Sequence, residues 1–130
     1  MSFGVGIGDI FVVLRVASEV YNSFREAPYD YRVLLGDLQR LYSALKGVSE
    51  VQEVIRSDKQ REKEFIPIIQ GCYDVLQEFK AITAQFYSLG TSNSGFRDRL
   101  KWSPEDSRDL RLRLISNLSS LSEFYARLNM

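Results

Sequence analysis

The sequence predicts an all-α protein: a bundle of four main helices, with a short helical turn before the last one. Apolar residues recur every three or four positions along most of the chain, which is the period of an amphipathic helix. No segment alternates apolar and polar residues in the way that a β-hairpin does. The length, 130 residues, is that of one domain, so residues 1–130 are expected to share a single core.

The first helix is expected over about residues 9–26. Asp9 follows a glycine-rich stretch and is a suitable N-cap residue. Residues 10–14 are apolar on every side, and the turns after them are amphipathic. The helix should end at residues 27–28, since the residue before Pro28 avoids the helical conformation.

The second helix, over about residues 28–55, has the most regular pattern. Its apolar positions step by three and four: Tyr31, Leu34, Leu38, Leu41, Leu45 and Val48. Such a seam serves either a coiled coil between two chains or packing within one chain. Leu35 and Tyr42 widen the seam into a broader stripe, which favours packing within the chain.

The third helix is expected over about residues 62–89, after an exposed polar connection at 57–64. One apolar stripe consists of Phe65, Ile69, Cys72, Leu76, Phe79 and Phe86, and a second of Ile68, Val75 and Ile82. Two stripes predict that this helix is central and the most buried. Pro67 predicts either a helix start close to it or a kink, because proline fits only the first turn of a regular helix.

The last helix has the clearest beginning. Ser103 is placed to cap it, Pro104 to occupy its first position, and acidic residues follow in the first turn. Residues 96–102 are expected to form the short helical turn that precedes it. Its apolar face is predicted to comprise Leu110, Leu114, Leu118, Leu121, Phe124, Tyr125 and Leu128.

Composition excludes several classes of function. The 17 basic and 17 acidic residues give zero net charge, which argues against nucleic acid as a partner. The chain has no histidine, so it lacks the commonest general base and the commonest metal ligand. We therefore expect no enzyme, no catalytic residues, no cofactor and no metal. The single cysteine, Cys72, lies on an apolar stripe and is expected to fill core space.

The N-terminal segment is unusual because it is apolar, rich in glycine and nearly uncharged. Its Gly-x-Gly-x-Gly spacing does not match a dinucleotide-binding loop, and no strand precedes it. It is also shorter than the roughly 20 apolar residues that a spanning helix needs. Two interpretations remain: a flexible lead-in to the first helix, or a mobile tip that binds a membrane or another partner.

Trp102 is a second candidate contact with lipid, because Arg99 and Lys101 lie beside it. Indole and basic groups both suit a membrane interface. The alternative, which we prefer, is that Trp102 closes one end of the bundle.

Residues 1–28, the leucine-rich second helix and residues 100–121 together resemble the HeLo-like domains at the N-termini of fungal NOD-like receptors and related cell-death proteins. The resemblance covers nearly the whole chain. It implies an α-helical bundle that rests in the cytoplasm, joined to a regulatory domain of the same full-length chain. On activation such a domain would self-associate and bring its N-terminal segment to membrane lipids.

Carried over to this sequence, the membrane-targeting residues would be Phe3, Val5, Ile7, Ile10, Phe11, Val12, Val13 and Leu14. The resemblance thus implies a non-enzymatic signalling domain for cell death or immunity. The alternative is a homotypic interaction or scaffold domain without membrane activity, in which the apolar tip packs in the bundle or in a dimer interface.

Overall fold

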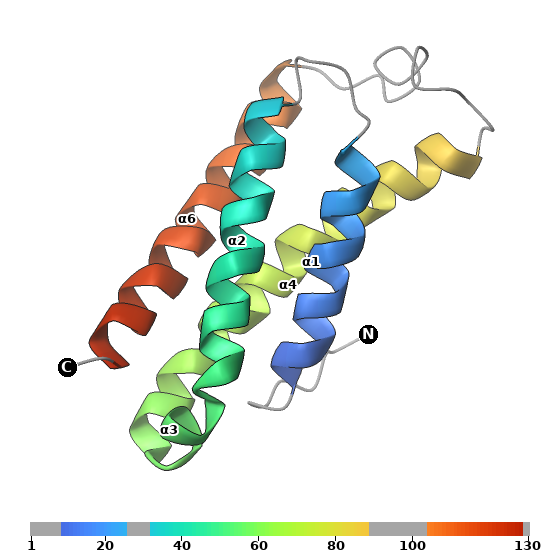
Figure 1. Ribbon diagram of the computed structural model, residues 1–130. Coiled ribbons are helices and arrows are strands. Elements are labelled where there is room, and N and C mark those ends of the chain that lie inside the picture. Colours follow the sequence, from blue (N-terminus) through green and yellow to red (C-terminus); the bar gives the residue numbers. More distant parts are fainter. Residues whose placement is uncertain (1–8, 26–31, 89–103, 129–130) are drawn as a thin grey trace.

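The computed structural model describes residues 9–25, 32–88 and 104–128, and nearly all of these residues are helical (Figure 1). The described residues form helices α1 (Ile10–Phe24), α2 (Arg32–Glu50), α3 (Gln52–Arg56), α4 (Lys59–Ser88) and α6 (Pro104–Leu128). They contain no strand. The expected all-α helical bundle is confirmed. The helical turn expected at residues 96–102 lies outside the described residues.

The four long helices are arranged so that each has two close neighbours. Helix α1 lies beside α2 and α4, and α6 also lies beside α2 and α4. Helices α1 and α4 run in one direction and α2 and α6 in the other, with α4 crossing obliquely behind (Figure 1). Helices α2 and α4, which follow each other in the chain, therefore lie at opposite corners of the bundle, and α3 joins them.

The seam expected on the second helix is confirmed, and it packs within the chain. Its members in the described part are all buried: Leu34, Leu38, Leu41, Leu45 and Val48. Leu35 and Tyr42, which widen the stripe, are half-buried against the same core. Tyr31 lies outside the described residues. The apolar face of α2 is therefore used for packing against α1 and α6.

The expected second helix is divided in two near its end. Val51, at φ −117° and ψ 24°, interrupts the helical backbone, and the short helix α3 follows. Ile55 of α3 is fully buried, so this short helix covers one end of the core. Only Ser57 and Asp58 then connect α3 to α4.

The expected exposed connection at 57–64 is wrong for residues 59–61, which already belong to α4, whose expected start is about residue 62. The Asp58 carboxylate accepts hydrogen bonds from the backbone N–H groups of Gln60, at 2.9 Å, and Arg61, at 3.4 Å. This is how an N-cap residue satisfies the first free donors of a helix. Lysine, arginine, glutamine and glutamate are good helix formers, so a polar run after a cap continues as helix.

The burial expected on α4 is confirmed where its side chains are described. The fully buried residues are Phe65, Ile69, Cys72, Leu76 and Phe79, with Val75 beside them. The expected central position is not found, because α4 lies at a corner of the bundle like the other long helices. Pro67 lies two turns inside α4, and it is exposed. Proline has no backbone N–H, so the Lys63 carbonyl one turn earlier receives no hydrogen bond from residue 67. Because Pro67 is exposed, this carbonyl lies on the side of α4 that faces water.

The two terminal helices begin where the sequence predicts. Helix α6 starts at Pro104, although the expected cap, Ser103, lies outside the described residues. Asp9 occupies the N-cap position of α1, without a capping bond from its side chain to the helix backbone. The core residues of α6 are Leu110, Leu114, Leu121 and Phe124, with Leu118, Tyr125 and Leu128 half-buried beside them.

The interface between α4 and α6 has a regular antiparallel register. Glu64 contacts Arg127, Phe65 contacts Phe124, and Glu78 contacts Arg113. At the middle of this interface a Cβ atom on Gly71 would lie 2.4 Å from Oδ1 of Asn117. The absence of a side chain at Gly71 therefore allows the two helices to approach closely.

Candidate functional site

The segment predicted to target membranes is described from Asp9 onward, and its residues differ sharply in exposure. Ile10 and Val13 are fully buried, while Val12 and Leu14 are half-buried. Phe11 is 53% exposed, which is unusual for a phenylalanine. Phe3, Val5 and Ile7 lie outside the described residues. Of the described members, Phe11 alone is largely available at the surface of the folded bundle.

Helix α1 is held in the bundle mainly by apolar burial. Its buried residues are Ile10, Val13, Val16, Ala17, Val20 and Phe24. Burial of the five larger side chains corresponds to roughly 8–15 kcal/mol of transfer free energy. That is comparable to the whole stability of a typical domain. Ile10 and Val13 can therefore reach another partner only if α1 exchanges the core for a second apolar environment.

Two further contacts fix the position of α1 against α4. The ring of Phe24 meets the ring of Phe79 edge to face, with centroids 5.8 Å apart. Glu19 and Lys80 form an ion pair at 3.6 Å, and both side chains are 47% exposed. An ion pair with this exposure contributes little to stability, since water screens it. The aromatic contact is thus the stronger of the two.

The second candidate contact with lipid, Trp102 with Arg99 and Lys101, lies outside the described residues.

Sequence reasoning missed a buried carboxylate between α2 and α6. Asp37 is 4% exposed, and it is the one charged residue among the described residues that is buried. Oδ1 of Asp37 accepts a hydrogen bond from Arg40, and Oδ2 accepts one from Arg111, both at 2.8 Å. Both carboxylate oxygens are thus paired. The only sequence signal was an aspartate flanked by apolar residues on a regular seam.

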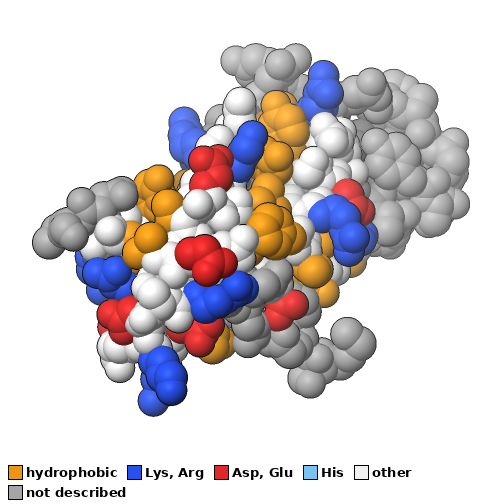
Figure 2. All heavy atoms as spheres, turned by 60° about the horizontal axis from the view of Figure 1, so that its bottom comes forward, with side chains coloured by type: hydrophobic (Ala, Val, Ile, Leu, Met, Phe, Trp, Pro, Cys, Tyr) orange, Lys and Arg blue, Asp and Glu red, His pale blue; other side chains and the backbone are white. Residues whose placement is uncertain are grey.

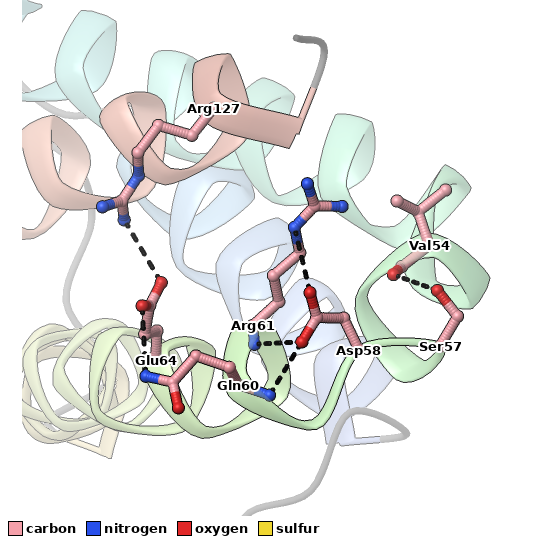
Figure 3. A network of polar contacts seen from close by, with 7 residues as sticks. All are labelled: Val54, Ser57, Asp58, Gln60, Arg61, Glu64 and Arg127. Atoms are coloured by element: carbon pink, nitrogen blue, oxygen red, sulfur yellow. Dashed lines mark hydrogen bonds and ion pairs between the residues drawn. The ribbon is translucent and has the colours of Figure 1, made fainter.

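A pocket of about 300 Å³ lies where the first turns of α4 meet the end of α6. Asp58, Arg61, Glu64, Phe124 and Arg127 are among the residues that line it. Figure 3 shows Arg127 reaching from α6 toward Glu64, at 3.9 Å, and Arg61 beside Asp58, at 3.8 Å. Each arginine thus has a carboxylate near it, so the pocket presents balanced charge rather than an anion site.

Cys72 has the environment of a core residue. It is fully buried, and burial raises the pKa of its thiol to about 12. The thiolate, which is the nucleophilic and metal-binding form, is therefore scarce near neutral pH. Within the described ranges no three cysteine or acidic residues come together as a possible metal site.

None of the helices, as far as the structure describes them, is both long enough and apolar enough to cross a bilayer. No family model matches the chain, and neither a curated protein nor a solved structure matches it.

Proposed function

We propose that this chain is a non-enzymatic signalling domain that self-associates on activation and reaches a membrane through its N-terminal apolar segment. The observation that supports this best is Phe11. Its ring is half exposed in the first turn of α1, and it follows the apolar residues Phe3, Val5 and Ile7 in the sequence. An exposed aromatic ring next to an apolar segment suits the boundary between lipid head groups and acyl chains.

Helix α1 has the properties of a helix that lies in the membrane plane. It has 15 residues and is therefore about 22 Å long, which is short of the roughly 30 Å hydrocarbon core. One face is apolar and packs in the bundle, whereas Phe11, Arg15 and Glu19 are exposed on the other side. At the interface these charged groups stay in water, whereas at the bilayer centre each would be costly.

In the proposed sequence of events the domain rests in the cytoplasm, attached to a regulatory domain of the same full-length chain. Activation brings several copies together and offers α1 a lipid surface. Phe11 makes the first contact with lipid from the exposed side of the folded bundle. The buried apolar face of α1 then exchanges the bundle core for lipid, so that much of the lost burial is regained.

Binding to lipid vesicles tests this proposal, with one exposed residue changed at a time. Phe11→Glu places a charge where the ring would insert, and Leu112→Glu places the same charge on α6. Leu112 is 57% exposed, so the two sites are matched in exposure and neither variant should unfold the domain. Flotation and dye release are measured with vesicles of phosphatidylcholine and phosphatidylglycerol. We expect Phe11→Glu to lose most of both activities and Leu112→Glu to retain them.

Equal vesicle binding by the two variants would contradict the proposal. The alternative is a homotypic scaffold domain without membrane activity. Its signature would be a mass that increases with concentration in light scattering, together with no binding of the wild-type domain to either lipid.

A further inference from the structure

The outer side of the contact between α1 and α2 carries partly exposed apolar side chains. On α1, the Glu19–Lys80 ion pair marks the flank that faces α4. Leu14 and Tyr21 are seven positions apart, so they lie on one side of the helix, on the flank away from Glu19. That flank faces α2, the other neighbour of α1.

The same reasoning places two residues of α2. The hydrogen bond from Arg111 to Asp37 marks the flank of α2 that faces α6. Leu35 and Tyr42 are also seven positions apart and lie on the opposite flank, toward α1. We call Leu14, Tyr21, Leu35 and Tyr42 the α1/α2 seam. In Figure 2, where the bottom of Figure 1 comes forward, hydrophobic side chains form a column on the visible face.

The seam is partly accessible to solvent. Its four side chains are half-buried and packed on the core, so each offers only an edge to solvent. Phe11, at 53% exposure, stands at one end. The seam and Phe11 together extend for about 15 Å along α1, from Phe11 to Tyr21. A flat bilayer contacts protruding groups, whereas a third helix can pack its apolar side chains against half-buried ones on two neighbouring helices.

The charges beside the seam are mainly positive. Arg15, Arg25 and Lys46 are exposed and form no ion pair with any residue that the structure describes. Glu19 is paired with Lys80 on the α4 side. Asp9, and Glu50 one turn after Lys46, are acidic and lie at the end of the seam where Phe11 stands, because α1 and α2 are antiparallel (Figure 1). A partner with acidic flanks would therefore meet opposite charge along most of this surface.

We propose that the α1/α2 seam binds an acidic amphipathic helix of a partner protein. Apolar side chains spaced by three, four and seven positions on that helix contact the seam, and its flanking carboxylates meet Arg15, Arg25 and Lys46. The bound helix contacts α1 and α2 together, so it also holds α1 in the bundle. This interaction requires no membrane activity and stands apart from the proposed function.

The test uses a fluorescent helical peptide of about 18 residues, with leucine at the contact positions and glutamate on both flanks. A matched peptide carries lysine in place of glutamate. Affinity is measured by fluorescence anisotropy, and the binding surface by chemical-shift changes in the ¹⁵N-labelled domain. We expect the glutamate peptide to bind about tenfold more tightly than the lysine peptide, with shifts along α1 and α2.

Charge-reversal variants test whether the basic residues beside the seam contribute to binding of the glutamate peptide. Arg15→Glu/Lys46→Glu should weaken binding of the glutamate peptide about tenfold. Lys59→Glu/Lys63→Glu, an equal change at exposed positions of α4, should leave the affinity unchanged. Circular dichroism verifies that both variants are folded.

Absence of binding, equal affinity for the two peptides, or shifts confined to other faces would each overturn the proposal. So would equal affinity of the two charge-reversal variants. If phosphatidylglycerol vesicles bind through the seam residues and the glutamate peptide does not, the surface belongs to lipid and the proposal is wrong.

Discussion

Helices α1 and α6 occupy opposite corners of the bundle, and they are held there by different kinds of contact. Both pack on α2 and α4. Helix α6 forms ion pairs with its neighbours through Arg111 to Asp37, Arg113 to Glu78 and Arg127 to Glu64, and the first of these involves the buried Asp37. Helix α1 is held by its buried apolar face, supplemented by Glu19–Lys80 and the ring contact of Phe24.

The difference matters because apolar burial has no direction. Hydrogen-bonded ion pairs specify which groups must face each other, and a buried carboxylate that loses its partners is costly. An apolar face is satisfied by any environment without water, including a lipid surface. Moving α6 would take Arg111 away from the buried Asp37 carboxylate, whereas Asp37, the buried charge among the described residues, would keep both its partners if α1 moved to a lipid surface.

Phe24→Ala is expected to have the largest effect, because it removes the main aromatic contact of α1 with α4. We expect a loss of about 3–5 kcal/mol in the free energy of unfolding, measured by urea denaturation. Phe124→Ala, at the matching contact of α6 with Phe65, should cost a similar amount. Amide exchange separates the two variants: Phe24→Ala should raise exchange first in α1, whereas Phe124→Ala should raise it in every helix together. Uniform exchange in both variants would remove the distinction between α1 and α6.

Asp37→Asn tests how much the ion pairs of Asp37 contribute to holding α6 against α2. It removes the charge that both Arg40 and Arg111 contact, at the position that joins α2 to α6. The arginine side chains are 69% and 44% exposed, so water solvates them when the carboxylate is lost. We therefore expect a moderate loss of about 1–2 kcal/mol in the free energy of unfolding. No loss would mean that α6 too is held by apolar burial alone.

Cys72 lies on α4, which packs against both α1 and α6. Its thiol makes the free energy of unfolding depend on pH. Burial raises the pKa of its thiol from 9.0 to about 12. Below pH 9 the thiol is protonated in the folded and the unfolded chain, so its contribution to stability is fully present. Between about pH 9 and 12 the unfolded chain loses this proton while the folded chain keeps it, so stability falls as pH rises.

At pH 10 this contribution should be reduced by about 1.4 kcal/mol. Because other groups also titrate there, the wild-type protein is compared with Cys72→Ala by urea denaturation at pH 8 and pH 10. The wild type should lose more stability than the variant over this interval. Parallel losses would show that the thiol is accessible to solvent in the folded bundle.

Two glycine substitutions are expected to have the smallest effects, and Gly36→Ala should be the more favourable of the two. A Cβ atom on Gly36 would come no closer than 4.0 Å to the Arg40 side chain, so Gly36→Ala should stabilise α2 by about 0.5–1 kcal/mol. On Gly71 the same atom would meet Asn117, whose Nδ2 donates to the Arg113 carbonyl at 2.9 Å. Gly71→Ala should therefore gain less than Gly36→Ala, or destabilise. Thermal unfolding of the two variants, side by side, measures the difference.

The sequence predicts the long helices well because each repeats its apolar pattern over many turns. The seam of α2 and the stripe of α4 are examples in which nearly every predicted core residue is buried. It starts α4 about three residues too late, at residue 62 instead of 59, since a charged turn at the surface has the composition of a loop. The capping bonds of Asp58 are what distinguish the two.

The apolar pattern of the sequence also does not reveal contacts between distant parts of the chain. Asp37 reads as an ordinary helix aspartate three positions before Arg40, and nothing local points to Arg111. The placement of α2 and α4 at opposite corners of the bundle is likewise set by how the apolar faces of the four long helices pack together. For the candidate site, the apolar spacing of residues 10–14 did not reveal that Ile10 and Val13 face the core while Phe11 faces solvent.

The most direct test of the central claim is to link α1 to the bundle and measure vesicle leakage. Glu19→Cys/Lys80→Cys places two exposed thiols at the α1–α4 ion pair, where a short bis-maleimide can join them. Glu78→Cys/Arg113→Cys does the same at the α4–α6 ion pair. Cys72 is buried and should not react. If α1 must leave the core to act on lipid, linking α1 to α4 abolishes dye release, whereas linking α4 to α6 preserves it. Equal dye release from the two linked proteins would contradict the account.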